Sequence, residues 1–313
     1  MLCTKLELKT IVECLRVKDP ALIVTVTGEH LRSAEETTIG FLEAHTVFRT
    51  MLQDFRLIGT QALRQGAPFD IDDQYKLSFH PFNEAATEAD LAVFFIQRGM
   101  YKSFYHHLRS FFELYLLATY FLAPQRRISE AHAWLDGKDK TPFMTRMLTA
   151  LFAEEEQFCR AQHVLQLKDM LQKTYGQFCD IVHNRGEKCG HVTLAKANFP
   201  RFLPETFEIG MEDFRNCIEL VCITFALRCP LILVGFPMLE KFGVNPPLSG
   251  FLDEMEAAAI RKYISPEGLT FLDDFIKKDE WVISATNWVR SKPDMSQEQI
   301  AEQLHDWQTR KRD

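Results

Sequence analysis

Several signatures that identify enzymes and extended folds at first sight are missing from this chain of 313 residues. There is no P-loop, no GxGxxG, no HExxH and no GxSxG motif, so the nucleotide, zinc-protease and serine-hydrolase sites that these motifs build are not expected. The chain also lacks an internal repeat, a low-complexity tract and a sustained heptad pattern. What is left is the profile of an ordinary globular protein whose function must be inferred from individual residues.

Positive charge is in short supply as well, because the net charge is −7. An acidic chain is unsuited to binding nucleic acid over its whole surface, although a local basic groove is compatible with it. The opening MLCTKLELKT lacks the apolar stretch of a secretory signal. The eight cysteines are scattered, and several lie within apolar helical patterns, so we expect reduced thiols in a cytoplasmic protein.

Apolar residues are plentiful, at 46%, and 26 of them are phenylalanines, which predicts a folded chain with an aromatic-rich core. The apolar stretch 220–239 is long enough to span a bilayer. It carries Arg228 in its middle, however, and a charge there is costly in a membrane. A core helix that breaks near Pro230 accounts for the same residues, and we expect no association with a membrane.

Helical periodicity dominates the chain, and Gly and Pro punctuate it. A capping box from Ser33 to Glu36 starts one expected helix, and Thr141-Pro142 suits the N-cap and first turn of another. The short run 21–28 is the best strand candidate and has no obvious partner strand. The expected long helices are 33–63; 87–122, stopped by Pro124; 143–184, with one interruption; and a last one from about Met211 to Pro230.

The fold expected from this pattern is all-α, an antiparallel bundle of four to five long helices with a small helical C-terminal extension. Residues 1–30 would form an N-terminal helix and a short edge strand, residues 31–245 the bundle, and residues 246–313 a C-terminal helical subdomain. In that last part, Ser265-Pro266 and the capping box from Ser296 to Gln299 each predict a helix start.

The helix expected over 101–122 is apolar on most of its circumference, which is typical of a buried helix. Arg109 and Glu113 lie inside it, four positions apart on one face. Buried charges persist only when they are paired and hydrogen-bonded. Because the order of Arg before Glu is the weaker one within an isolated helix, a further partner elsewhere in the fold is favoured. The pair either fixes the helix register or lines a polar pocket.

The segment YGQFCDIVHNRGEKCGH, residues 175–191, concentrates side chains that can do chemistry. Cys179, His183, Cys189 and His191 supply the sulfurs and nitrogens of a structural zinc site, but their spacing is not that of a zinc finger or knuckle, and no metal is expected. Cys179 beside His183 could form a thiol nucleophile. A third chemistry is RNA cleavage by an arginine and a histidine, which requires no metal or other cofactor.

The stretches HHLRSFFELYLLATYFL, residues 106–122, and YGQFCDIVHNRG, residues 175–186, resemble the two motif helices of an uncharacterised bacterial helical family. That family is similar to the HEPN superfamily and to abortive-infection proteins. The resemblance covers about residues 106–190. It implies a helical bundle that forms a homodimer and binds or cleaves RNA without a metal ion, in a bacterial defence or toxin role.

Active HEPN proteins carry an arginine followed, after a short spacer, by a histidine. Arg185 and His191 have that spacing, whereas in the register that uses His183 the arginine position falls on residues 176–178, which contain none. We therefore take His183, Arg185 and His191 as catalytic candidates. Arg109, Glu113 and Asn184 are the binding candidates. The alternative is a non-catalytic structural or regulatory interaction module, and whether the chain is an enzyme stays open.

Overall fold

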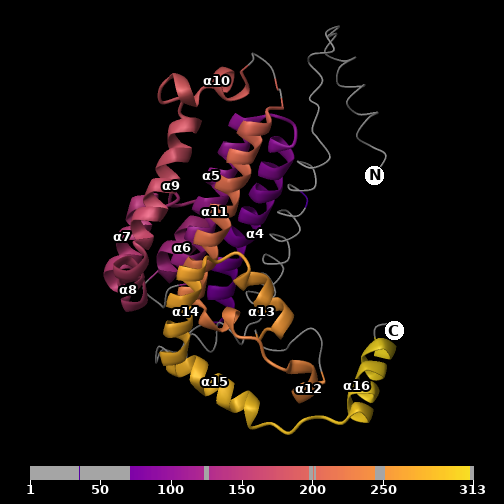
Figure 1. The fold of residues 1–313 in the computed structure, drawn as a ribbon. Helices are drawn as coiled ribbons and strands as arrows, with labels where there is room; N and C mark the ends of the chain where they lie inside the picture. The colour runs from indigo at the N-terminus through magenta and orange to yellow at the C-terminus, as the bar shows by residue number, and fades with distance from the viewer. Residues whose placement is uncertain are drawn as a thin grey trace.

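The computed structural model describes residues 71–122, 127–196, 202–243 and 251–310, together with positions 35 and 200; the side chains of residues 71–79, 191–192 and 307–310 are outside this description. Across these ranges the chain is helical, and β-structure is limited to a single bridge between Gly235 and Leu252, which confirms the all-α prediction (Figure 1). The helices, with η denoting 3₁₀-helices, are α4 (Ile71–Ile96), α5 (Tyr101–Phe121), α6 (Ile128–Leu135), α7 (Met144–Glu154), α8 (Glu156–Leu165), α9 (Leu167–Val182), η2 (Glu187–Cys189), α10 (His191–Ala195), α11 (Pro204–Arg228), η3 (Pro230–Leu233), α12 (Met238–Phe242), α13 (Glu254–Arg261), α14 (Pro266–Lys278), α15 (Glu280–Arg290) and α16 (Gln297–Arg310).

α5 is the central helix of the bundle, because α4, α9 and α11 all pack against it (Figure 1). Aromatic side chains fill the space between these helices, as the abundance of Phe predicts. Phe111 of α5 lies 6.1 Å from Phe214 of α11, and Phe82 of α4 lies 5.1 Å from Tyr115 of α5, measured between ring centroids. The Tyr101 hydroxyl donates to the carbonyl of Leu203 and so ties the start of α5 to the start of α11.

The single helix expected over 87–122 is wrong, since two helices cover this region and a tight turn at residues 97–100 separates them. Gly99 has a φ of 66°, a left-handed conformation that favours glycine and ends α4. Its amide donates to the carbonyl of Ile96. The turn reverses the chain, so α4 and α5 form a helical hairpin and lie side by side.

The helix expected over 143–184 has two interruptions rather than one. It breaks at Glu155, which has extended backbone angles, and again at Gln166, which has a φ of 54°. Thr141 does not cap α7, which begins two residues after Pro142, because the Thr141 hydroxyl accepts a hydrogen bond from the indole of Trp134 instead. α6, which carries Trp134, has no counterpart among the expected helices.

α11 starts at Pro204, seven residues before the predicted Met211, and ends at Arg228 as the prolines indicated. Arg228, in the last turn of α11, forms an ion pair within the core. Arg228 is 3% exposed and donates to Glu155 at 2.6 Å, in the break between α7 and α8. This ion pair explains how an arginine sits in an apolar stretch. Across the described residues, none of the helices combines the length and the apolar character needed to cross a membrane.

Two of the C-terminal helices, α14 and α16, begin where the sequence predicts. Ser265 caps α14, with Pro266 in the first turn, and Ser296 and Gln299 exchange the two hydrogen bonds of a capping box at the start of α16. Buried side chains of α13, α14 and α15 belong to the same apolar cluster as those of the bundle. The strand candidate at 21–28 and, apart from position 35, the helix expected over 33–63 lie outside the described residues.

Candidate functional site

A strip of incompletely buried side chains runs along α5 and meets a similar strip on α9. On α9 the strip has a spacing of four residues, which places successive members one above another on a helix. The polar side chains of the two helices contact one another from Tyr175 to the C-terminal end of α9. We call this group the α5–α9 cluster; its members are Lys102, Arg109, Glu113, Tyr175, His183 and Asn184.

Arg109 is at the centre of the cluster. Its Nη2 donates to Glu113 at 3.3 Å and to the hydroxyl of Tyr175 at 3.0 Å. Burial lowers the pKa of Arg109, but the Tyr175 hydrogen bond and the Glu113 charge outweigh that effect, so the pKa lies above its ordinary value. Tyr175 is thus the further partner that the order of Arg109 and Glu113 favoured. The two charged side chains are 22% and 27% exposed, so the pair is at the edge of the core rather than sealed within it.

Tyr175 is one of the two residues of the cluster to which the sequence assigned no role; the other is Lys102. The Tyr175 hydroxyl donates to Glu113 while it accepts from Arg109, and the Arg109 guanidinium carbon lies 5.3 Å from the ring centroid. Burial raises the pKa of Tyr175 well above its ordinary value, and the adjacent Glu113 carboxylate raises it further, so the hydroxyl stays protonated. The available signal was its position eight residues before His183, two steps of four on the same helix face.

His183 is the C-cap residue of α9 and is exposed. Its Nε2 lies 3.5 Å from Nη1 of Arg109, the outer limit of a hydrogen bond. Two of the predicted binding and catalytic residues, Arg109 and His183, are therefore brought together from positions 74 residues apart. Among the described residues, Arg109 Nε is buried and has no hydrogen-bond partner, so this donor faces the protein rather than the exposed edge. The arrangement combines a fixed cation with a group that can carry a proton near neutral pH.

Asn184 and Lys102 extend the cluster toward the start of α5. Asn184 has a φ of 51°, which ends α9, and its side-chain oxygen accepts from Lys102 Nζ at 2.7 Å. Lys102, which sequence reasoning did not single out, is a second half-buried cation of the cluster and lies at the C-terminal end of α9. The C-terminal end of a helix carries partial negative charge, so these cations also stabilise the end of α9.

The other two catalytic candidates are placed differently. Arg185 is exposed and donates to Asp180 of α9 at 3.1 Å. His191 begins the short helix α10 after η2, and its side chain lies outside the description. Over the ranges that the structure describes, no three His, Cys, Asp or Glu side chains lie close enough together to hold a metal ion.

A second polar contact on α5 joins buried Tyr105 to half-buried Asp213. The Tyr105 hydroxyl of α5 donates to Asp213 of α11 at 2.7 Å. Burial raises the pKa of Asp213, against the hydrogen bond from Tyr105, which lowers it. Burial also raises the pKa of Tyr105, with a further contribution from the Asp213 charge. These two side chains join α5 to α11 just as Tyr175 joins α5 to α9.

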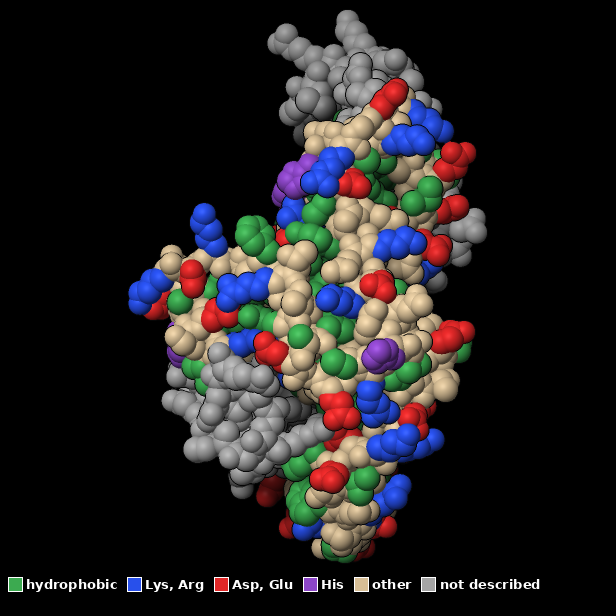
Figure 2. All heavy atoms as spheres, turned by 90° about the vertical axis from the view of Figure 1, so that its left-hand side faces the viewer, with side chains coloured by type: hydrophobic (Ala, Val, Ile, Leu, Met, Phe, Trp, Pro, Cys, Tyr) green, Lys and Arg blue, Asp and Glu red, His purple; other side chains and the backbone are tan. Residues whose placement is uncertain are grey.

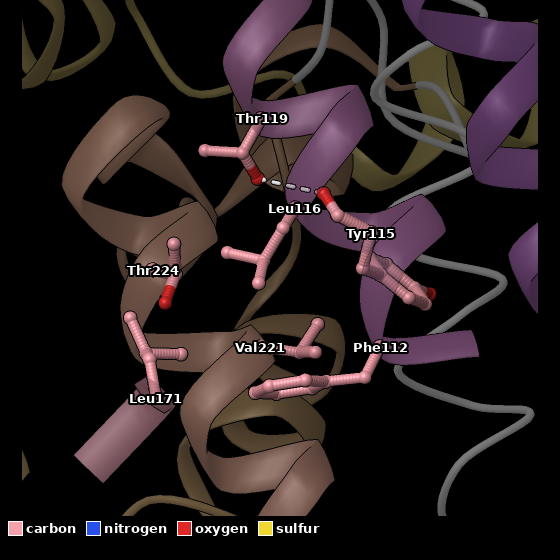
Figure 3. A pocket seen from close by; sticks show the side chains of 7 residues that line it. All are labelled: Phe112, Tyr115, Leu116, Thr119, Leu171, Val221 and Thr224. Carbon is pink, nitrogen blue, oxygen red and sulfur yellow. Dashed lines mark hydrogen bonds between the residues drawn. The ribbon is translucent and has the colours of Figure 1, made fainter. Parts of the chain in front are cut away.

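One turn beyond Glu113, a small gap remains between α5, α9 and α11 (Figure 3). It is too small to admit a water molecule. The hydroxyls of Thr119 and Thr224 donate to carbonyls of their own helices, so neither is directed at a ligand. The gap is therefore a packing defect rather than a binding pocket. Its lining residues are Phe112, Tyr115, Leu116, Thr119, Leu171, Val221 and Thr224.

The surface around α9 is mixed in charge. Figure 2 faces the side that lies on the left of Figure 1 and shows Lys and Arg side chains interspersed with Asp and Glu. On that face, positive charge is local rather than continuous, in line with the net charge of −7. Comparison of the chain with family models, with curated proteins and with solved structures gives no match. Function must therefore be argued from the cluster itself.

Proposed function

We propose that the α5–α9 cluster binds the phosphate backbone of RNA and cleaves it without a metal ion, as the resemblance to HEPN-like proteins implies. The observation that carries the proposal is the 3.5 Å approach of Arg109 Nη1 to His183 Nε2 at a partly exposed edge of the bundle. A cation and a titratable imidazole at this distance can act on the same phosphodiester. The same resemblance implies that two copies of the chain pair as a homodimer.

Each residue has a defined part in this reaction. His183 takes the proton from a ribose 2′-hydroxyl, whose oxygen forms a bond to phosphorus while the bond to the 5′-oxygen breaks. Arg109 neutralises the charge that develops on the non-bridging oxygens, and Tyr175 and Glu113 hold its guanidinium in place. His191 is the candidate for protonating the departing 5′-oxygen. The products are a 2′,3′-cyclic phosphate and a 5′-hydroxyl.

The flanking polar residues would hold the strand rather than react with it. Lys102 adds a charge to the same edge, positioned by its hydrogen bond to Asn184. Arg185, exposed at the end of α9, can reach a neighbouring phosphate once its contact with Asp180 opens. Because each phosphate contact releases counterions, binding should weaken as the salt concentration rises.

The test is cleavage of end-labelled, mixed-sequence RNA by the full chain in the presence of EDTA. We expect the parent to cut and His183→Ala to be slower by about 10²- to 10⁴-fold, the usual contribution of an acid–base group. Arg109→Lys should also be slower, because a lysine lacks the planar fork. His191→Ala and Arg185→Ala test the remaining two candidates.

Two matched controls separate chemistry from general damage. His163→Ala removes another exposed histidine, at the end of α8, and Arg160→Lys alters another partly exposed arginine. Both should cut RNA at the parental rate. Equal cleavage by the parent and by His183→Ala, or no cleavage by the parent at all, contradicts the ribonuclease proposal.

The second candidate is a non-catalytic interaction module in which the cluster only orders the bundle. One observation favours it: the charge of Arg109 is already compensated by Glu113, and Tyr175 bonds to both, so the group joins α5 to α9 without a ligand. In this case Arg109→Ala and Glu113→Ala lower the melting temperature by several degrees, and neither the parent nor the variants bind RNA. Melting curves and RNA titrations on the same samples distinguish the two functions.

A further inference from the structure

Trp288 of α15 is 46% exposed, although its ring packs against other aromatic side chains. Its ring stacks on Phe242, at the end of α12, with centroids 5.4 Å apart and planes 19° apart. It also stacks on Phe251, at 5.9 Å and 17°. Phe236 supports Phe251 from the edge at 5.0 Å. We call Trp288, Phe242 and Phe251 the Trp288 platform.

A positive charge lies over the indole ring of the platform. Lys292 Nζ lies 4.8 Å from the centroid of the Trp288 ring. The Lys292 carbonyl accepts a hydrogen bond from Lys241 Nζ at 2.8 Å, which holds this part of the chain in place. Lys241 also pairs with Asp294 at 2.7 Å, two residues after Lys292.

We propose that the Trp288 platform binds a nucleotide, with the base stacked on the indole in place of the Lys292 ammonium and the ammonium moved to the phosphate. Base stacking on an aromatic side chain is sequence-tolerant and needs no pocket, only a supported ring with solvent-accessible area. The two phenylalanines supply that support. Lys292 disfavours a cationic ligand, and an apolar protein segment laid over the platform would strip this ammonium of water without giving it a counter-charge.

The platform is separate from the α5–α9 cluster. Figure 1 places α12 and α15 at the lower end of the molecule, opposite the end where α9 leads into α10. The nucleotide can come from a single RNA strand or from a free mononucleotide, and both sources present the same base and phosphate. Binding of an RNA strand rests on the proposed function, whereas binding of a nucleotide by the platform does not. The proposed function and the nucleotide site can therefore fail separately.

The test is a fluorescence-anisotropy titration of the full chain with a labelled oligoadenylate, followed by competition with AMP. We expect Trp288→Ala to weaken binding about tenfold, the usual effect of losing one stacked base. Trp288→Phe should retain most of the affinity, since a ring remains. Lys292→Ala should reduce the dependence of affinity on salt, because one phosphate contact is lost. Ile283→Ala, which removes another exposed apolar side chain from α15, should bind as the parent does.

The outcomes are decisive in both directions. Displacement by AMP at similar base concentrations supports the free nucleotide as source, and displacement by unlabelled strand alone supports RNA. If Arg109→Ala binds as tightly as the parent and Trp288→Ala binds more weakly, the platform binds the ligand and the α5–α9 cluster does not contribute. Equal binding by the parent and Trp288→Ala overturns the inference. A parent that binds neither ligand also overturns the inference. This holds as well if light scattering then shows that Trp288→Ala changes the oligomeric state, since the platform would be a contact between copies of the chain.

Discussion

Tyr175 of α9 holds the guanidinium of Arg109 of α5 in two ways, through a 3.0 Å hydrogen bond to its hydroxyl and through a ring whose centroid is 5.3 Å from the guanidinium carbon. The hydroxyl contact fixes the direction of the guanidinium, and the ring limits its movement. Glu113 receives hydrogen bonds from both partners. The three side chains therefore form a closed triangle across two helices, which makes their energies interdependent.

Replacing Tyr175 by Phe keeps the ring and removes only the hydroxyl. Arg109 then loses an acceptor and Glu113 a donor, so the free energy of unfolding should fall by about 1–3 kcal/mol. Urea denaturation of the parent, Tyr175→Phe, Glu113→Gln and the double variant measures the coupling. We expect the two changes to be non-additive by at least about 0.5 kcal/mol. Lys173→Ala, an exposed change on the same helix, should be additive with Glu113→Gln; additivity of both pairs would contradict the triangle.

The side chains of the ion pair Arg228–Glu155 are 2% and 7% exposed, and removing Arg228 leaves the buried Glu155 carboxylate with only the longer contact to Arg127, at 3.6 Å. Arg228→Met should lower the free energy of unfolding by about 3–5 kcal/mol. The double variant Arg228→Met, Glu155→Leu should recover part of that loss, because both members of the pair are removed and buried Arg127 keeps its contact with Glu154 at 2.8 Å. The exposed pair Lys138–Asp136 serves as control, and Lys138→Ala should change stability by less than about 1 kcal/mol. A mild Arg228→Met variant would show that water reaches this part of the core.

Gly210 of α11 lies against the α4–α5 hairpin, and a Cβ there would be 2.6 Å from Ile96 Cδ1 and 3.1 Å from the Phe104 ring. Gly210→Ala should therefore destabilise the protein by about 1–3 kcal/mol, as overpacking does. Gly176 of α9 has nothing within 4 Å of the same added atom. Gly176→Ala should raise stability by about 0.5–1 kcal/mol, since Ala is the better helix former. Thermal melts of the two variants should shift in opposite directions.

Asp213 predicts a pH dependence. Burial raises its pKa, so the folded chain binds more protons than the unfolded chain in the interval above the ordinary carboxyl pKa of about 3.9. The free energy of unfolding therefore falls as pH rises through that interval. Asp213→Asn removes this loss and keeps an oxygen that can accept from Tyr105. Its stability relative to the parent should increase from about pH 4 to about pH 7 in urea titrations, whereas Asp139→Asn, in an exposed loop, should show no such trend.

The sequence predicted well where local chemistry decides the structure. Ser265 with Pro266, and Ser296 with Gln299, mark helix starts because their hydrogen bonds are made within one turn. It was less successful where a tertiary contact competes. Thr141 would suit an N-cap, but its hydroxyl is used by Trp134, seven residues earlier, and the helix starts later.

The same division holds for the cluster. That Arg109 and Glu113 would be paired, with a partner elsewhere, followed from the cost of isolated charges in an apolar helix. The partner itself, Tyr175, is 66 positions away, and no local pattern specifies which residue a helix will meet at that distance. Lys102 was missed for the same reason, because its contact with Asn184 spans 82 positions.

The turn at Gly99 has a consequence for the order in which the cluster forms. α4 and α5 are neighbours in the chain, so their contacts close a short loop and cost little conformational entropy. Arg109 and Tyr175 meet only after a loop of 66 positions has closed. We therefore expect the hairpin of α4 and α5 to form before α9 docks against Arg109. A chain leaving the ribosome thus carries only half of the cluster until synthesis has passed His183.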